Sequence, residues 1–394
     1  MNHFYDGRVP IVQFEDRPLL DLGWGHPRAD LLPADGWARA SGRALRAYGW
    51  QALTYGHAAG PAPLIDWLCG RAGDTVPEQV FVTAGASHGL ALATEVLTRP
   101  GDVVLVDSPS YHLAFRILAD RDVTLLRAPA DEHGLLPLEL PDLGPAQPLL
   151  YLVPTFANPT GRSLPAERRR ELADLARRGR VTVLEDDTYR DLAYDSPAPP
   201  SLWSLAGGRG VVRLGSFAKT VAPGLRLGWI TGSPDLVDRL SRLGYVHSGG
   251  GVNHTVAMTM AVFGAEGAYD RHVARLRSEY AVQRDALVEA LHEHGLPVET
   301  PAGGWFVWLP LPGSATATAS VSATASASVS AERLLPVAER HGVSFVPGPR
   351  FWVDGSGGDN RARLSFSRLP APDLTEAARR LAAAVHRLPP DLAT

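Results

Sequence analysis

The sequence predicts an α/β protein with a large, mostly parallel central sheet between helices and a smaller α+β unit after it. From about residue 80 to residue 230, short apolar and β-branched runs alternate with longer helical patterns. Parallel strands need a crossover connection, usually a helix, so this alternation is typical of βαβ units. The 394 residues are also enough for about two domains.

Six short apolar runs predict the strands of the central sheet. They are residues 80–83, 103–106, 149–153, 181–184, 211–214 and 228–231. The stretch 166–178 is rich in Glu, Arg, Leu and Ala and predicts a helix between the third and fourth strands. A long amphipathic helix is expected at 269–294 and a final helix at 374–385, because apolar residues recur there with helical spacing.

These elements predict three parts of the chain. Residues 1–45 form an N-terminal arm that contributes to the small domain and to the pocket, and residues 46–260 form the large domain. Residues 261–394 form the small C-terminal domain. Within it, residues 313–331 are nearly all Ser, Ala, Thr and Val, a composition that cannot bury a core, so an exposed insert is expected.

Charge and hydropathy exclude several classes of protein. The formal net charge is −4, and acidic and basic residues are spread along the chain without a basic stripe. We therefore expect neither a nucleic-acid partner nor a polybasic contact with a membrane. No apolar run approaches the length of a membrane span, and the first residues do not resemble a secretion signal, so a cytoplasmic location is expected. We expect no metal site.

One residue stands out by composition, because Lys219 is the only lysine among 38 basic side chains. A guanidinium stays protonated, whereas a desolvated lysine amine can lose its proton and attack a carbonyl group. The unique lysine therefore indicates a need for a primary amine. The alternative is a surface lysine that survived by chance, and the neighbouring motifs must decide between the two.

The loops that follow the predicted strands come next, because ligands of open α/β sheets bind beyond the carboxyl ends of the strands. Gly85, Ala86 and Ser87 follow the first strand and begin a helix, whose free N–H groups suit a phosphate. After the third strand, Asn158–Gly161 is a turn with an amide that can donate to a ligand oxygen. Either segment could instead be a purely structural turn.

Charged groups follow the fourth and fifth strands. The fourth strand leads into Glu185, Asp186 and Asp187, whose burial would be costly without a cationic partner such as a protonated ring nitrogen. A solvated acidic loop or a helix cap is the alternative. The fifth strand leads to Lys219, with Ser216 and Arg226 close in sequence. Serine and arginine suit a phosphate, and the lysine suits an aldehyde.

An aldehyde, a phosphate and a ring nitrogen together describe pyridoxal 5′-phosphate. The chain resembles the class I/II aminotransferases of the fold-type I pyridoxal-phosphate enzymes, in particular the kynurenine/α-aminoadipate aminotransferase branch. The resemblance runs from about Leu22 to the C-terminus, broken mainly by the Ser/Ala/Thr insert. It rests on five motifs in order: Asn158-Pro159-Thr160-Gly161, Asp186 three residues before Tyr189, Ser216-x-x-Lys219, Arg226, and Arg363-Leu364-Ser365-Phe366-Ser367.

The resemblance implies roles around the cofactor ring. Lys219 would hold the cofactor as an internal aldimine and then move the proton between Cα and the cofactor carbon. Asp186 would keep the ring nitrogen protonated, so that the ring can accept electrons. Asn158 and Tyr189 would hydrogen-bond the ring phenolate, with Tyr189 counted among the catalytic residues. Tyr111 would stack on the ring, although it could instead be a core aromatic.

The resemblance also implies a phosphate site, a substrate site and a dimer. Gly85, Ala86, Ser87, Ser216 and Arg226 would bind the phosphate. Tyr55 would reach the phosphate of a neighbouring subunit, which implies a homodimer with shared active sites. Arg363 would bind the substrate α-carboxylate, since a guanidinium fork matches a carboxylate, although it could merely cap a helix. The other expected substrate contacts are Gly23, Asn158 and Phe351.

Two features depart from the family pattern. His88 stands where relatives usually carry glutamine or another small polar or apolar residue, and Gly249–Gly251 replaces a bulkier loop. Both could reshape the substrate side of the site. For His88 the alternative is a helix residue with its hydrogen bonds satisfied, and we favour that interpretation.

The function implied is transfer of an amino group between an L-amino acid and a 2-oxo acid in a ping-pong cycle. The same cofactor also supports elimination, decarboxylation, cyclisation and oxidation, so these reactions stay open. A MocR-type regulator domain is disfavoured, because such proteins carry a winged-helix domain ahead and the family-like sequence starts near residue 22.

The substrate side chain is left open by the sequence. An aromatic or long-chain amino acid would fit the stretch 23–26, which contains Trp24, together with Trp305 and Phe351. A cationic side chain would instead fit the acids Asp6, Glu15, Asp16 and Asp21.

Overall fold

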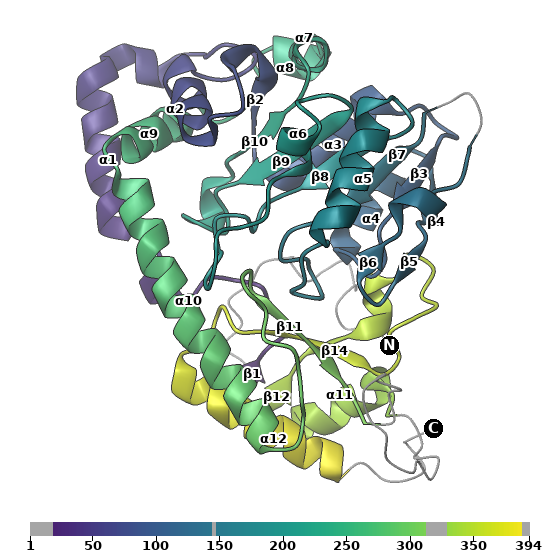
Figure 1. The fold of residues 1–394 in the computed structure, drawn as a ribbon. Coiled ribbons are helices and arrows are strands. Elements are labelled where there is room, and N and C mark those ends of the chain that lie inside the picture. Colours follow the sequence, from purple (N-terminus) through teal and green to yellow (C-terminus); the bar gives the residue numbers. More distant parts are fainter. Residues whose placement is uncertain (1–18, 144–146, 313–328, 388–394) are drawn as a thin grey trace.

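The computed structural model describes residues 19–143, 147–312 and 329–387 (Figure 1). Most of the predicted insert, residues 313–328, lies outside the described residues, and so does the part of the N-terminal arm that precedes residue 19. Asp6, Glu15 and Asp16 therefore lie outside them too. No helix in the described ranges is long and apolar enough to cross a membrane.

A seven-stranded sheet forms the centre of the larger part. Its order is β2-β10-β9-β8-β7-β3-β4, with β2 at Val80–Thr83, β3 at Val103–Val106, β4 at Thr124–Arg127, β7 at Leu149–Leu152, β8 at Thr182–Asp186, β9 at Val211–Ser216 and β10 at Gly228–Thr231. All neighbours pair in parallel except β10, which is antiparallel to β2 and β9. The predicted mostly parallel sheet is confirmed. The sequence missed β4, an edge strand that is largely exposed and so lacks a buried apolar pattern.

Helices cover both faces of this sheet (Figure 1). On one face, α3 (Ala86–Leu97), α4 (His112–Ala119) and α7 (Pro234–Ser241) pack on one apolar cluster. On the other face, α2 (Ala62–Ala72) and α9 (His254–Ala265) cover β2, while α5 (Ala166–Arg177) and α6 (Leu202–Leu205) cover β7 and β8. Strands buried on both faces explain the continuous apolar runs in the sequence.

The remaining described elements of the larger part are short, apart from α1 (Ala34–Tyr48), which packs along α9. The helix α8 spans Gly244–His247 and follows α7. Beside the sheet, β5 (Ala130–Asp131) and β6 (Gly134–Leu135) form a two-stranded hairpin.

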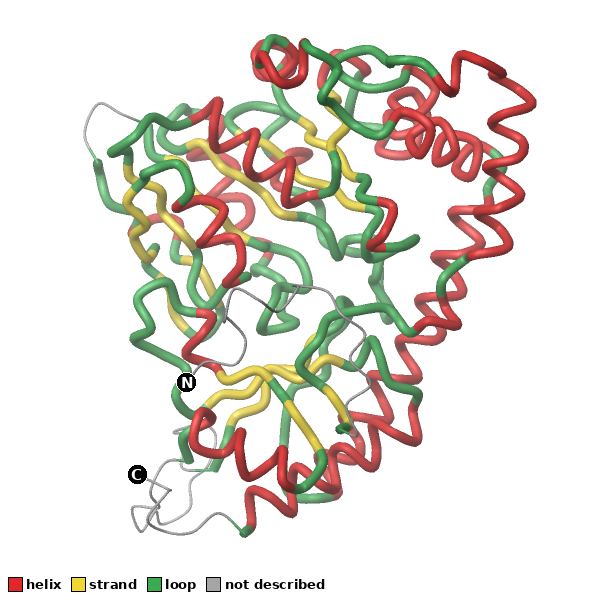
Figure 2. The backbone as a smooth tube through the Cα atoms, turned by 180° about the vertical axis from the view of Figure 1, so that it is seen from behind, coloured by secondary structure: helices red, strands yellow, loops and turns green. Residues whose placement is uncertain are grey.

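The smaller part contains a three-stranded antiparallel sheet, β11-β14-β13, formed by Phe306–Pro310, Arg361–Ser365 and Val346–Pro347. The helices α10 (Ala268–Glu293), α11 (Ala331–Arg340) and α12 (Ala371–His386) complete it, and α10 runs down from the larger part (Figures 1 and 2). β1 (Leu20–Asp21) pairs in parallel with β12 (Val343–Ser344), so the described end of the arm joins this part. The domain limits given above stay a prediction.

A buried arginine holds the turn after β7 in place. Arg169, on α5, is fully buried. Its Nε donates to the Leu164 carbonyl at 2.9 Å, and its Nη1 donates to the Pro200 carbonyl at 3.1 Å. Its Nη2 donates to the Pro154 carbonyl and to Thr155 Oγ1. One side chain therefore satisfies several backbone groups that would otherwise be buried without partners.

We expect Arg169→Leu to lower the free energy of unfolding by more than about 2 kcal/mol, because buried acceptors would lose their donor. Urea unfolding followed by circular dichroism measures the change. Arg170→Leu on the exposed side of the same helix is the matched control. Equal stability of the two variants would contradict this account.

Candidate active site

Three parallel strands deliver the predicted site residues to one edge of the large sheet. β8 ends at Asp186, β9 ends at Ser216 three residues before Lys219, and the turn after β7 carries Asn158. Because β7, β8 and β9 run in the same direction, their carboxyl ends meet at this edge. The arrangement is that expected of a ligand site in an open α/β sheet.

Lys219 lies half-buried against aromatic rings. Its Nζ is 4.8 Å from the ring centroid of Trp305 and 5.7 Å from that of Tyr189. Burial lowers the pKa of Lys219 to about 8; the Asp186 carboxylate opposes this shift, and the charges of Arg363 and Arg226 add to it. A larger fraction of this amine is therefore neutral near pH 8 than of an ordinary lysine, as a nucleophile requires.

Asp186 is buried and keeps one oxygen available. The Tyr151 hydroxyl, on β7, donates to Asp186 Oδ2 at 2.9 Å, while Oδ1 has no hydrogen-bond partner among the described residues. Burial raises the pKa of Asp186, and the hydrogen bond from Tyr151 opposes that shift. A buried carboxylate oxygen without a partner fits a protonated ring nitrogen. The sequence analysis missed Tyr151, although a tyrosine inside an otherwise aliphatic strand was a usable signal.

The other two acids of the motif are also buried. The carboxylate of Glu185 accepts the backbone N–H groups of Leu202 and Trp203 at 2.8 and 3.0 Å, at the start of α6. Burial raises the pKa of Glu185 to about 7. Asp187 lies 3.5 Å from Arg190. A solvated acidic loop is therefore the wrong interpretation, and a helix cap is right for Glu185 alone.

The turn between β2 and α3 meets Arg226. Gly85 has a φ of +89°, a backbone conformation that favours glycine, and a Cβ there would lie 2.7 Å from Arg226 Nη2, the end of a flexible side chain. Arg226 Nη2 donates to the Ala84 carbonyl at 3.2 Å. Ala86 and Ser87 form the first turn of α3, whose N–H groups suit an anion. The structure thus brings together Gly85, Ala86, Ser87 and Arg226, which were predicted to bind the phosphate.

Ser216 also reaches this edge, buried at the end of β9. Its Oγ accepts the Ala218 N–H at 3.1 Å, which leaves its own hydroxyl proton available to donate.

Arg363 lies buried on β14 and links the two parts of the molecule. Its Nη1 donates to Asn158 Oδ1 at 2.9 Å, and its Nη2 donates to the Gly23 carbonyl. The guanidinium carbon lies 4.4 Å from the ring centroid of Phe306 and 5.0 Å from that of Phe351. Both of these acceptors lie outside helices, which disfavours the alternative of a helix cap.

The aromatic residues predicted around the pocket are buried to different extents. Trp305 and Phe351 are fully buried, whereas Trp24 is 36% exposed. The Phe351 carbonyl accepts the N–H of Ser110 at 2.9 Å, next to the half-buried Tyr111. The loop that carries Phe351 therefore contacts the loop that carries the predicted stacking residue.

Tyr55 is not brought to the site by its own chain. It is 82% exposed, and its ring lies against Gly249, where a Cβ would come 2.9 Å from Tyr55 Cε1. His88 has a local role, since its Nδ1 accepts the Ala84 N–H at 3.0 Å and its ring stands edge-on to Tyr245. This geometry agrees with the favoured interpretation of His88 as a satisfied helix residue.

Sequence comparison identifies the family. The model of aminotransferase class I and II matches residues 17–381. The chain belongs to this family. Among curated relatives, this aminotransferase is 32% identical to a 2-aminoadipate transaminase of Thermus thermophilus, over 96% of this chain and 93% of that protein. It is 29% identical to aromatic-amino-acid aminotransferase 1 of Thermococcus litoralis, over 95% and 89% of the two chains.

Solved structures agree with this assignment. The α-aminoadipate aminotransferase LysN of Thermus thermophilus, complexed with N-(5′-phosphopyridoxyl)-L-leucine, has a TM-score of 0.80 and 32% identity, covering 94% of this aminotransferase and 92% of LysN. A kynurenine aminotransferase of Pyrococcus horikoshii has a TM-score of 0.82 and 28% identity, covering 94% and 91% of the two chains. The predicted family, its fold-type I architecture and its pyridoxal 5′-phosphate cofactor are confirmed. The residue roles stay predictions.

We expect capture of pyridoxal 5′-phosphate by the apoenzyme to accelerate as pH rises through about 8 and to level off from about one unit above that pH. Only the neutral amine reacts, and the lowered pKa of Lys219 brings that form to full population well below pH 10.5. Stopped-flow absorbance measures the rate, with Nα-acetyl-lysine as the control for an ordinary amine. A rate that kept rising to pH 10 would contradict the lowered pKa.

Proposed function

We propose that this aminotransferase moves an amino group between an L-amino acid and a 2-oxo acid in a ping-pong cycle, with Lys219 as both the cofactor attachment and the proton carrier. The observation that supports this most is the position of Lys219, the only lysine, whose partly buried amine lies within electrostatic reach of the buried Asp186. The cofactor site and the proton carrier are then built from the same strand ends.

The described residues account for each part of the cofactor. When bound, pyridoxal 5′-phosphate supplies a reactive carbonyl carbon and a protonated ring that withdraws electrons from Cα. Asp186 Oδ1 would accept the ring N–H, while the hydrogen bond from Tyr151 orients the carboxylate. Asn158 and Tyr189 would donate to the ring phenolate, and Tyr111 would stack on the ring. Tyr189 is held edge-on by Trp305 at 5.9 Å.

The phosphate is held by the first turn of α3, Ser216 and Arg226, which together supply backbone N–H groups, a hydroxyl and a guanidinium. We propose that Tyr55 of a second subunit completes this site in a homodimer. Its 82% exposure supports that role, because a large aromatic side chain left in water by its own chain is available to another.

The substrate α-carboxylate binds Arg363. Its guanidinium is fixed by two aromatic rings and by Asn158, so the carboxylate meets a donor whose orientation is already set. Gly23, whose carbonyl accepts from Nη2 of the same guanidinium, lies beside this carboxylate site.

We infer that the substrate side chain is aromatic or aliphatic. Trp305, Phe306 and Phe351 surround the groups that bind the α-carboxylate and the amine. Asp21, an acid considered for a cationic side chain, is engaged elsewhere: its Oδ1 accepts the Gly23 N–H at 2.7 Å, and its Oδ2 lies 3.5 Å from Arg368.

The first test is chemical. Borohydride treatment of the purified yellow protein should fix a phosphopyridoxyl group on the peptide that contains Lys219, as detected by mass spectrometry. Lys219→Ala should lose the adduct and turn over no amino acid, because no other described group supplies a neutral amine at this position. An adduct on any other peptide would refute the proposed cofactor attachment.

Product analysis distinguishes transamination from the other reactions of this cofactor. Incubation with aromatic, aliphatic, acidic and basic L-amino acids and 2-oxoglutarate should yield a new amino acid and a new 2-oxo acid in equal amounts. Release of ammonia or carbon dioxide in their place would favour elimination or decarboxylation.

Arg363→Lys should raise the KM for the amino acid at least about tenfold while the cofactor absorbance persists, because a lysine cannot make the bidentate contact. Steady-state kinetics at saturating 2-oxo acid measure the change. Arg379→Lys, at an exposed position of α12, is the control for replacing an arginine away from the site. An unchanged KM for Arg363→Lys would exclude Arg363 as the carboxylate site.

A further inference from the structure

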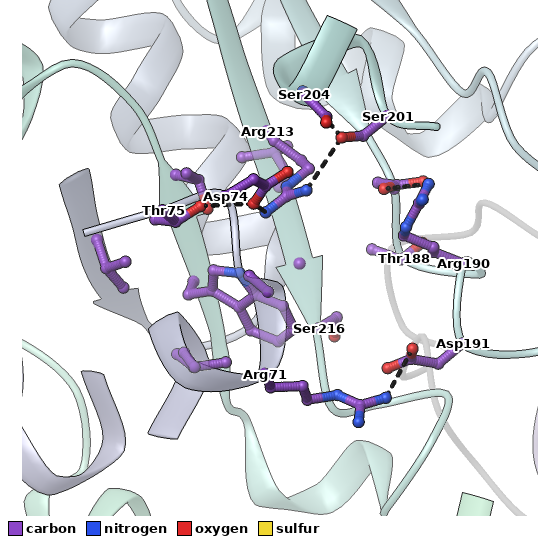
Figure 3. Close-up of a pocket in the computed structure, with 18 of the residues that line it drawn as sticks. Arg71, Asp74, Thr75, Thr188, Arg190, Asp191, Ser201, Ser204, Arg213 and Ser216 are labelled. Atoms are coloured by element: carbon purple, nitrogen blue, oxygen red, sulfur yellow. Dashed lines mark hydrogen bonds and ion pairs between the residues drawn. The ribbon is translucent and has the colours of Figure 1, made fainter. Parts of the chain in front are cut away.

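A cavity lies next to the candidate active site, on the face of the large sheet that α2 and α6 cover (Figure 3). Its volume is about 480 Å³. β9 and β10 form its floor, and the loops after β8 and β9 form one wall. Lys219, Asp186 and Arg363 are absent from the described residues that line it. The cavity therefore lies beside the site described above and shares Ser216 with it.

Arg213 and Asp74 carry opposite charges and both line this cavity, but they are too far apart for a hydrogen bond. Arg213, on β9, donates from Nη1 to Ser201 Oγ at 3.2 Å, and its Nη2 lies 3.7 Å from Asp74 Oδ1 (Figure 3). That second distance is too long for a hydrogen bond. A guanidinium has five N–H donors, and the hydrogen bond to Ser201 is the one that Arg213 makes among the described residues. The Arg213 side chain is only 11% exposed, so its unused donors face the cavity or the protein and not bulk water.

The opposite end of the cavity is already neutralised, and one wall is apolar. Arg71 is joined to Asp191 at 2.9 Å, below the first pair in Figure 3. Trp67, Phe217 and Trp229 contribute aromatic surface between the two pairs. The buried Asp187 also lines the cavity and interacts electrostatically with Arg213. The cavity thus combines Arg213 and its acidic neighbours with an apolar wall.

We propose that this cavity binds a zwitterionic α-amino acid. The ligand carboxylate contacts Arg213 and the Ser201 hydroxyl, its ammonium group contacts Asp74, and its side chain lies on the aromatic wall. The two charges of an α-amino acid are separated by a single carbon atom, which matches two protein charges 3.7 Å apart. A simple anion would meet the carboxylates of Asp74 and Asp187, and a simple cation would meet the Arg213 guanidinium, so each would be repelled by part of the lining.

Binding of L-leucine to borohydride-treated protein tests this proposal, because the treatment stops turnover at the first site. Isothermal calorimetry should detect one L-leucine per chain. 4-Methylpentanoate lacks the ammonium group and L-leucinamide lacks the carboxylate, so each should bind at least about tenfold more weakly. No binding of L-leucine at about 10 mM, or equal binding of the three compounds, would overturn the proposal.

Variants then separate the two sites. Asp74→Asn and Ser204→Phe should each weaken binding at least about tenfold, the first by removing a charge and the second by placing a ring at the exposed edge of the cavity. Ser278→Phe, at an exposed position of α10, is the control for added bulk. Arg363→Lys should leave this binding unchanged.

Binding that persists in Ser204→Phe and disappears in Arg363→Lys would assign the ligand to the catalytic site and refute the second site. Displacement of L-leucine by inorganic phosphate would also refute it, since the cavity would then be an anion site. Neither outcome depends on whether Lys219 holds the cofactor, which the adduct experiment decides separately.

Discussion

The burial of Asp186 is the constraint on which the rest of the candidate site depends. A carboxylate away from water must be neutralised or hydrogen-bonded, and here the Tyr151 hydroxyl donates to Asp186 Oδ2 while Thr188 also stabilises the charged form. The remaining oxygen has no partner among the described residues, so a cationic ligand group would stabilise it. We propose that the single lysine, the turn before α3 and Arg363 bind the other parts of the same ligand and of the substrate.

The protein holds the guanidinium of Arg363 in a fixed orientation without any substrate. Arg363 lies between two aromatic rings and donates to Asn158, which belongs to the turn after β7. Arg169 holds that turn from the other side through hydrogen bonds to Pro154 and Leu164. The two arginines differ in role. We propose that Arg363 orients the substrate, whereas Arg169 stabilises the backbone of the turn that carries Asn158.

The success of the sequence predictions varied with the kind of information that each required. Six strands followed from local apolar runs, because a strand buried on both faces needs such a run whatever its neighbours are. β4 was not predicted, because an exposed edge strand has no such apolar run. Tyr151 and Arg169 escaped for another reason: their importance lies in a hydrogen bond to a carboxylate 35 residues away and in one to a carbonyl 31 residues away, which no local pattern encodes.

The sequence by itself determined which reactive groups are present: one lysine amine at Lys219, an acid after a strand and a glycine turn before a helix. It also determined the family to which the chain belongs. The tertiary structure decided what those groups experience. Arg363 meets Asn158 across 205 residues of chain, and Lys219 acquires a pKa of about 8 because folding removes its amine from water. Residue type is local, whereas distance and desolvation arise only when remote segments pack together.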